Sequence, residues 1–129
     1  MADPIYLNAG EPNPELAAAL QRYYRLQFVD IVGSAATYDP TLHLNRVLRL
    51  AAGLGEVLVT VPPTTLEGNS FAIWARAGSW PRIITSGAGT VLSPYGHKAG
   101  VPLGVLSVLV GANVGGAAAE IILQGASVP

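Results

Sequence analysis

The sequence predicts a mainly β fold, an antiparallel β-sandwich or jelly-roll-like domain with one N-terminal amphipathic helix. Large or β-branched apolar residues recur at every second position along short segments, most clearly Val57, Val59 and Val61 in 56–61 and Phe71 and Ile73 in 70–76. Turn residues separate these segments at intervals of about eight to twelve residues, the spacing typical of sandwiches. Apolar residues make up 50% of the chain and charged residues 12%, which indicates a compact domain rather than a disordered chain.

The 129 residues predict one domain over 13–129, preceded by an extended arm over 1–12. Asn13, Pro14 and Glu15 form a helix start, because Asn caps, Pro suits the first turn and Glu favours the positive end of the dipole. A helix is therefore expected over about 14–27. Its apolar residues recur at helical spacing: Leu16, Ala19, Leu20, Tyr23 and Tyr24.

Two strands are expected before the middle of the chain. Residues 28–32 are apolar and end at a Gly-Ser pair, which predicts a short strand, and a loop is expected from there to Pro40. Residues 42–51 alternate leucines with polar residues, which favours a half-buried strand. A helix is the competing interpretation of that segment, because some of its apolar residues also fit a spacing of 3.6.

The central prediction is a hairpin of two strands, 56–63 and 70–76. Valines at period two suit a pleated, half-buried surface in the first strand. Pro62 and Pro63 cannot donate ladder hydrogen bonds, so the strand ends there. The turn that follows contains Gly68 and joins the two strands in this interpretation.

The C-terminal half predicts more short strands. The uncharged run 99–119 is long enough to span a membrane, but Pro102 and several glycines interrupt it, which favours strand, turn and strand with no membrane partner. The expected strands are 80–85, 90–92, 105–110 and 117–124, with an irregular loop over 93–100 and a tail over 125–129.

Composition also bears on partners. With so few charged residues, the surface is expected to be partly buried against other chains. The alternative is a compact β domain with a neutral surface of Ser, Thr and Gly. The net charge of −1 supplies no basic field, so no nucleic-acid partner is expected.

The sequence offers little for catalysis or metal binding. It has no cysteine, and His43 and His97 lie on separate segments without a carboxylate spaced to complete a metal site. No nucleophile elbow or phosphate-binding loop is present. We therefore expect no catalytic residue, no metal and no cofactor, and a protein that is not an enzyme.

The candidate interface residues are aromatic and basic. Trp74 and Arg76 lie close in sequence to Trp80 and Arg82, and across a hairpin formed by the segments 70–76 and 80–85 they form one exposed Trp/Arg patch. Such a patch suits a protein interface, because Trp and Arg are enriched at binding hot spots. Packing within the domain, or stacking on sugar or nucleic acid, are the alternatives. The Tyr23–Tyr24 pair joins these candidates as an interface, with packing against the domain as its alternative.

Part of the pattern resembles a known group of domains. Residues 59–62 (Val-Thr-Val-Pro), a turn with Gly68, residues 71–73 (Phe-Ala-Ile), residues 83–85 (Ile-Ile-Thr) and residues 87–90 (Gly-Ala-Gly-Thr) resemble the small β-domains of bacteriophage virion proteins. Those domains occur in capsid decoration (cement) proteins and in fibres. The resemblance covers roughly 47–124.

The resemblance implies a non-enzymatic structural protein, made in the host cytoplasm and located on the capsid exterior. It implies a homotrimer whose partner is the major capsid protein or another virion protein. The arm and the N-terminal helix are then candidates for capsid or neighbour contact. The alternative is a phage fibre or receptor-binding module that contacts glycan through exposed Trp and Arg residues.

Overall fold

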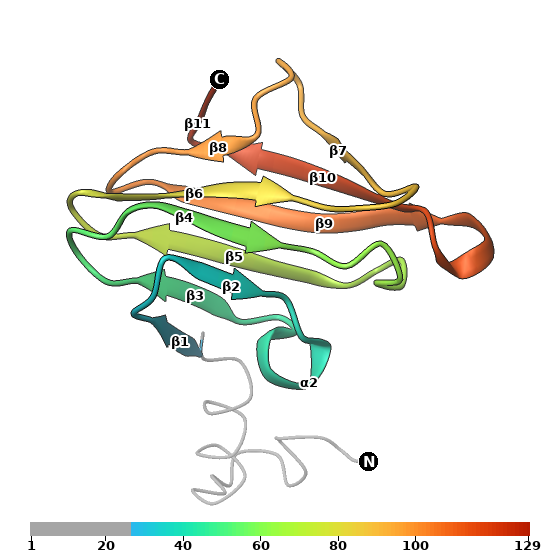
Figure 1. The fold of residues 1–129 in the computed structure, drawn as a ribbon, viewed down its shortest axis with the longest axis horizontal. Helices are drawn as coiled ribbons and strands as arrows, with labels where there is room; N and C mark the ends of the chain where they lie inside the picture. Colours follow the sequence, from blue (N-terminus) through green and yellow to red (C-terminus); the bar gives the residue numbers. More distant parts are fainter. Residues whose placement is uncertain (1–26) are drawn as a thin grey trace, which may run out of the picture.

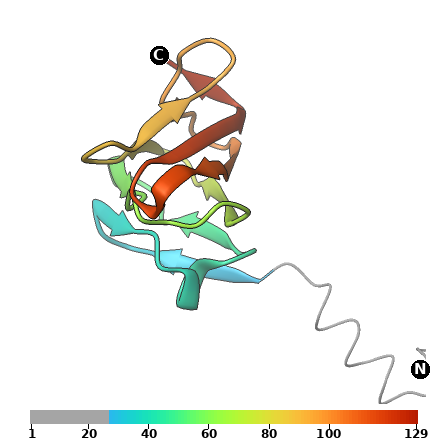
Figure 2. The ribbon, with the colours of Figure 1, turned by 90° about the vertical axis from the view of Figure 1, so that its right-hand side faces the viewer.

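The computed structural model describes residues 27–129, which form two β-sheets with the hydrophobic core between them (Figure 1 and Figure 2). The prediction of a mainly β fold with two sheets is confirmed. The six-stranded sheet has the order β1 (Phe28–Ile31), β3 (Val47–Leu50), β5 (Ser70–Ala75), β9 (Val105–Asn113), β10 (Ala119–Gly125) and β7 (Thr90–Leu92). The five-stranded sheet has the order β11 (Ser127–Val128), β8 (Ala99–Gly100), β6 (Ser79–Ile84), β4 (Gly55–Thr60) and β2 (Ala35–Thr37).

The chain winds between the two sheets in coils. Strands β1, β3 and β5 pair in parallel in one sheet, and β2, β4 and β6 pair in parallel in the other. We call β1–β2 the first coil, β3–β4 the second and β5–β6 the third. Strands of one sheet run in the same direction here because the chain crosses to the opposite sheet and returns before it pairs again.

This winding corrects the prediction of an antiparallel domain. Within residues 27–129, five of the nine strand pairings are parallel, including β10 with β7. Antiparallel pairing is found where β9 joins β5 and β10, and where β8 joins β6 and β11.

The predicted central hairpin is wrong. Strands β4 and β5 have the expected positions, but β4 pairs with β2 and β6, whereas β5 pairs with β3 and β9. The connection over 61–69 therefore carries the chain from one sheet to the other. Asn113 holds this connection, because its amide Nδ2 donates to the carbonyls of Pro63 (3.1 Å) and Thr65 (2.7 Å).

The segment 42–51 is shorter as a strand than expected. A single helical turn, α2 (Pro40–His43), precedes β3. The carboxylate of Asp39 accepts from the backbone N–H of Thr41 (2.9 Å), and Pro40 occupies the first turn, so local capping favours the helix here.

Most other strands lie close to their predicted positions. Sequence reasoning missed β2, which it assigned to a loop, and the two-residue strands β8 and β11; the turn over 112–116 contains η1 (Val114–Gly116). The expected arm (1–12) and helix (about 14–27) lie outside the described residues except at Gln27, which is in no regular element. Within 27–129 no helix is long and apolar enough to cross a membrane.

The core consists of the inward side chains of both sheets. Leu48, Leu50, Val57 and Val59 are fully buried, and Tyr38 closes one end of the core. The Tyr38 ring stacks on Phe71 with 4.5 Å between centroids. The remaining buried hydrophobic members of this core are Val61, Ile73, Ala75, Ile83, Leu106, Val108, Val110, Ala119, Ile121 and Leu123.

Candidate interaction faces

The outer face of the six-stranded sheet carries a row of apolar side chains. The strand register places Leu109 of β9 beside Ile122 of β10, and Ile122 beside Leu92 of β7. Leu109 is 42% exposed and Leu92 is 47% exposed, with Ile122 partly exposed between them. We call Leu92, Leu109 and Ile122 the apolar stripe. These positions alternate with buried core residues, so the same pleat that fills the core turns the stripe outward.

An aromatic cluster lies on the same face, towards the other edge of the sheet. The rings of Phe28 and Trp74 are 6.4 Å apart. The guanidinium of Arg49 lies 4.6 Å from the centre of the Phe28 ring, and that of Arg76 lies 5.6 Å from the Trp74 ring. We call Phe28, Trp74, Arg49 and Arg76 the aromatic cluster. Planar cations over aromatic faces add electrostatic attraction to the apolar contact.

Little net charge remains on this face. Arg49 pairs with Asp30 across β1 and β3, with 2.7 Å between Nε and Oδ1 and a second bond of 3.2 Å. The hydrogen bond from Arg49 lowers the pKa of Asp30 and in turn raises the pKa of Arg49. Two further charges of opposite sign lie on the described part of this face: Arg76 of the aromatic cluster, directly after β5, and Glu120 of β10.

The outer face of the five-stranded sheet is a second, separate surface. Trp80 lies beside Glu56 in the strand register, and Arg82 donates to the Glu56 carboxylate at 2.7 Å. Leu58 of β4 is 38% exposed beside Arg82. This face combines one aromatic ring, one ion pair and one exposed leucine.

The single Trp/Arg patch predicted from the sequence is therefore wrong in its geometry. Trp74 and Arg76 contact one another at the six-stranded sheet, whereas Trp80 and Arg82 extend outward from the five-stranded sheet. The turn after β5 leads into the opposite sheet rather than into a hairpin. The role of these four residues in an interface stays a prediction. Tyr23 and Tyr24 lie outside the described residues.

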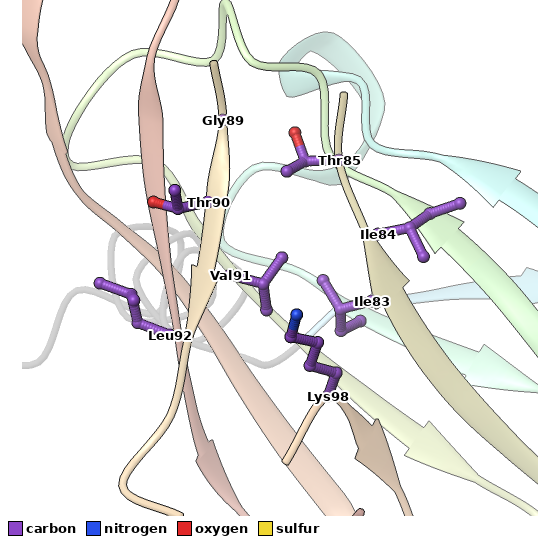
Figure 3. Close-up of a pocket in the computed structure, with 8 residues that line it drawn as sticks. All are labelled: Ile83, Ile84, Thr85, Gly89, Thr90, Val91, Leu92 and Lys98. Carbon is purple, nitrogen blue, oxygen red and sulfur yellow. The ribbon is translucent and has the colours of Figure 1, made fainter. Parts of the chain in front are cut away.

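A slot of about 410 Å³ opens between β6 of the five-stranded sheet and β7 of the six-stranded sheet. Figure 3 shows the side chains of Ile83, Val91 and Lys98 converging on it from β6, β7 and the residue before β8. Lys98 is the only ionisable residue in its lining, and the rest is aliphatic, threonine or glycine. The slot therefore brings no acid and base together.

The two histidines occupy different surroundings. His43 is buried, and its Nδ1 accepts a hydrogen bond of 3.0 Å from the backbone N–H of Asp39. Burial lowers the pKa of His43, and nearby Arg46 adds to this while Asp39 opposes it. His97 lies 3.2 Å from the hydroxyl of Ser127. Within 27–129 no group of three or more His, Asp or Glu side chains is placed to hold a metal ion.

The fold and its faces define a small two-sheet β domain whose conspicuous surfaces are apolar and aromatic. Comparisons of the chain with protein-family models, with curated proteins and with solved structures find no match. Sequence reasoning missed the apolar stripe, because its three residues come from strands far apart along the chain. The alternation in 105–110 was visible, but the row depends on the pairing of β7, β9 and β10.

Proposed function

We propose that this protein is a non-enzymatic structural protein that assembles with copies of itself and binds a viral capsid surface as a decoration (cement) protein. The proposal includes a homotrimer, a capsid or other virion protein as partner, and a location on the capsid exterior. It treats the two-sheet domain as a variant of the jelly-roll-like sandwich of such virion proteins, with an N-terminal helix over about 14–27.

The observation that carries this proposal is the outer face of the six-stranded sheet. The apolar stripe and the aromatic cluster share this face, and the one ion pair there is internally neutralised. Interfaces are depleted of charge in their centre and enriched in aromatic residues and Arg. Apolar and aromatic side chains gathered on one face commonly mark interaction sites, so contact with another chain is a simple way to cover them.

The second face supports a protein with two kinds of partner. When copies of the chain cover the six-stranded sheet, the five-stranded sheet with Trp80 and Leu58 remains available. A decoration protein needs this division, because it must contact its own copies and the capsid at the same time.

The test of self-assembly is the solution mass, measured by light scattering on a sizing column over a range of concentrations. We expect a trimer for the natural chain and a smaller mass for Leu109→Lys, which places a charge in the apolar stripe. Leu58→Lys is the matched control, because this leucine has similar exposure on the other sheet, and we expect it to remain a trimer. A monomer at every concentration would refute the proposed assembly.

Capsid binding is tested separately by cosedimentation with capsids. Deletion of residues 1–12 removes the proposed contact arm and is expected to lower capsid occupancy while the trimer is retained. Unchanged occupancy would exclude the arm as the capsid contact.

A second candidate function has one supporting observation. Trp74 is partly exposed beside Phe28 and Arg76, an arrangement that suits stacking against a sugar ring. A fibre or receptor-binding module would use it to contact glycan. A glycan-array signal that Trp74→Ala abolishes would favour this function over decoration, and no signal from the natural chain would remove it.

A further inference from the structure

The first coil forms an open end of the domain. Strand β1 is the edge of the six-stranded sheet and β2 is the edge of the five-stranded sheet, so both sheets stop at the same end (Figure 1). The C-terminus lies at the other end, with β11 at the far edge of its sheet (Figure 2). No described strand pairs with the free side of β1 or β2.

Burial of the inward residues decreases towards this end in the six-stranded sheet. Register places Val29 of the first coil beside Leu48 of the second and Ile73 of the third. Leu48 and Ile73 are 0% and 1% exposed, whereas Val29 is only half-buried. The next inward position repeats this, because Ile31 is half-buried beside the fully buried Leu50.

The five-stranded sheet shows the same gradient. Ala36 of the first coil lies beside Val59 and, one strand further, Ile83. Val59 and Ile83 are buried and Ala36 is only half-buried. Val32, which links β1 to β2, is 75% exposed. The inside of the first coil is thus apolar, and the described residues leave it partly uncovered.

The chain enters the domain at this end. Gln27, the residue before β1, is held to β3 because its carbonyl accepts from the backbone N–H of Val47 at 2.9 Å. Residues 1–26 therefore join the described domain at this end. The sequence predicts an amphipathic helix over about 14–27, with Arg22 and Arg25 largely opposite its apolar residues. At 1.5 Å per residue, thirteen helical residues span about 20 Å, which exceeds the separation of about 10 Å between packed sheets.

We propose that residues 14–26 cap the first coil by laying their apolar side, which contains Leu16, Leu20 and Tyr23, across the open end between β1 and β2. The segment is joined directly to β1, so its effective concentration at this end is far above that of a second copy. Such a cap also shields two parallel edges that would otherwise pair with other chains, as terminal caps do in stacked-repeat proteins. This inference does not depend on the proposed function.

Disulfide trapping tests which chain covers the end, because the natural sequence contains no cysteine. We expect the pair Leu20→Cys and Ala36→Cys to form an intramolecular disulfide, seen on a non-reducing gel as a monomer band of altered mobility that no longer reacts with a thiol reagent. The control pair, Leu20→Cys and Val128→Cys, places the second thiol on β11 and is expected to stay reduced. A product of twice the chain mass would assign the end to a second copy, and the absence of any product would overturn the cap.

Hydrogen exchange gives a second test that does not require the cap for folding. Leu20→Asp is expected to raise the exchange rates of β1 and β2 amides at least tenfold, while β9 and β10 amides keep their protection. Arg22→Asp is the matched control, since it places the same side chain on the opposite side of the predicted helix, and it is expected to change neither group. Equal rates at β1 and β2 in both variants would refute the proposal.

Discussion

Trp74 and Trp80 project from opposite outer faces of the domain, although only a short turn separates their strands. Trp74 lies against Phe28 on the six-stranded sheet, and Trp80 lies beside Glu56 on the five-stranded sheet. A single flat partner therefore cannot contact both rings on one molecule. The two tryptophans are expected to serve different contacts.

Substitution of the two tryptophans should separate these contacts. We expect Trp74→Ala to weaken self-association at least tenfold, because truncation of a tryptophan at a binding hot spot costs about 2 kcal/mol or more. Trp80→Ala should leave self-association unchanged and lower capsid occupancy instead. Sedimentation and capsid binding on both variants provide the check, and an equal loss of self-association in both would contradict the assignment of faces.

Ser79 should be a critical polar residue of the core. It is fully buried, its hydroxyl donates to the carbonyl of Ala51 and it accepts from the backbone N–H of Leu54 at 2.9 Å. Ser79→Ala leaves both backbone groups without this partner, which is expected to cost about 1–3 kcal/mol each. Urea unfolding measures the loss. Ser70→Ala is the control, because its hydroxyl bond to Asn45 is exposed, and it should change stability by well under 1 kcal/mol.

Asn113 should hold the connection between β4 and β5. Its Nδ2 donates to two backbone carbonyls, and its Oδ1 accepts from the backbone N–H of Ala118 at 3.0 Å. Asn113→Asp keeps the shape but removes both donated bonds, so we expect a loss of about 2 kcal/mol or more at neutral pH. Asn113→Asp should recover part of this stability in acid, where the protonated carboxyl donates again. A pH-independent loss would contradict this account.

His43 should make stability depend on pH. Burial lowers the pKa of the folded-state imidazole below its ordinary value of 6.5, and its Nδ1 must be unprotonated to accept from Asp39. The contribution is therefore fully present above pH 6.5 and decreases as the pH falls below it, because the unfolded chain binds the proton first. Urea midpoints measured from pH 7.5 downward should fall in the natural chain.

The variant His43→Asn should reduce this slope, because no group titrates at that position. His97→Asn removes the other histidine and should retain the slope. If the slope survives in His43→Asn and vanishes in His97→Asn, the pH dependence of stability comes from His97, and the role given to His43 is wrong.

The ion pair between Asp30 and Arg49 should be lost in acid. Arg49 lowers the pKa of Asp30 below 3.8, so the contribution of Asp30 is present above pH 3.8 and is lost as the pH falls below it. Because the carboxylate is exposed, Asp30→Asn should change the neutral-pH midpoint little. The acid decline should become shallower in this variant, and an unchanged acid decline would show that the pair does not hold β1 to β3.

The sequence by itself determined where most strands lie and which side chains point inward. The recurrence of Val57 and Val59, and of Phe71 and Ile73, at every second position appears directly as the buried faces of β4 and β5, and the residues between them are exposed or partly exposed. This is so because the period of two is a local property of extended backbone. Trp74 and Trp80, which the sequence predicts in one exposed patch, are each partly exposed.

Only the tertiary structure decided which strands pair. A turn such as 76–78 can fold two strands into a hairpin or carry the chain to the opposite sheet, and the periodicity of the strands is the same in both cases. The parallel coils, the separation of Trp74 from Trp80 and the apolar stripe all follow from that choice. They depend on contacts between residues far apart in the chain, which no local pattern encodes.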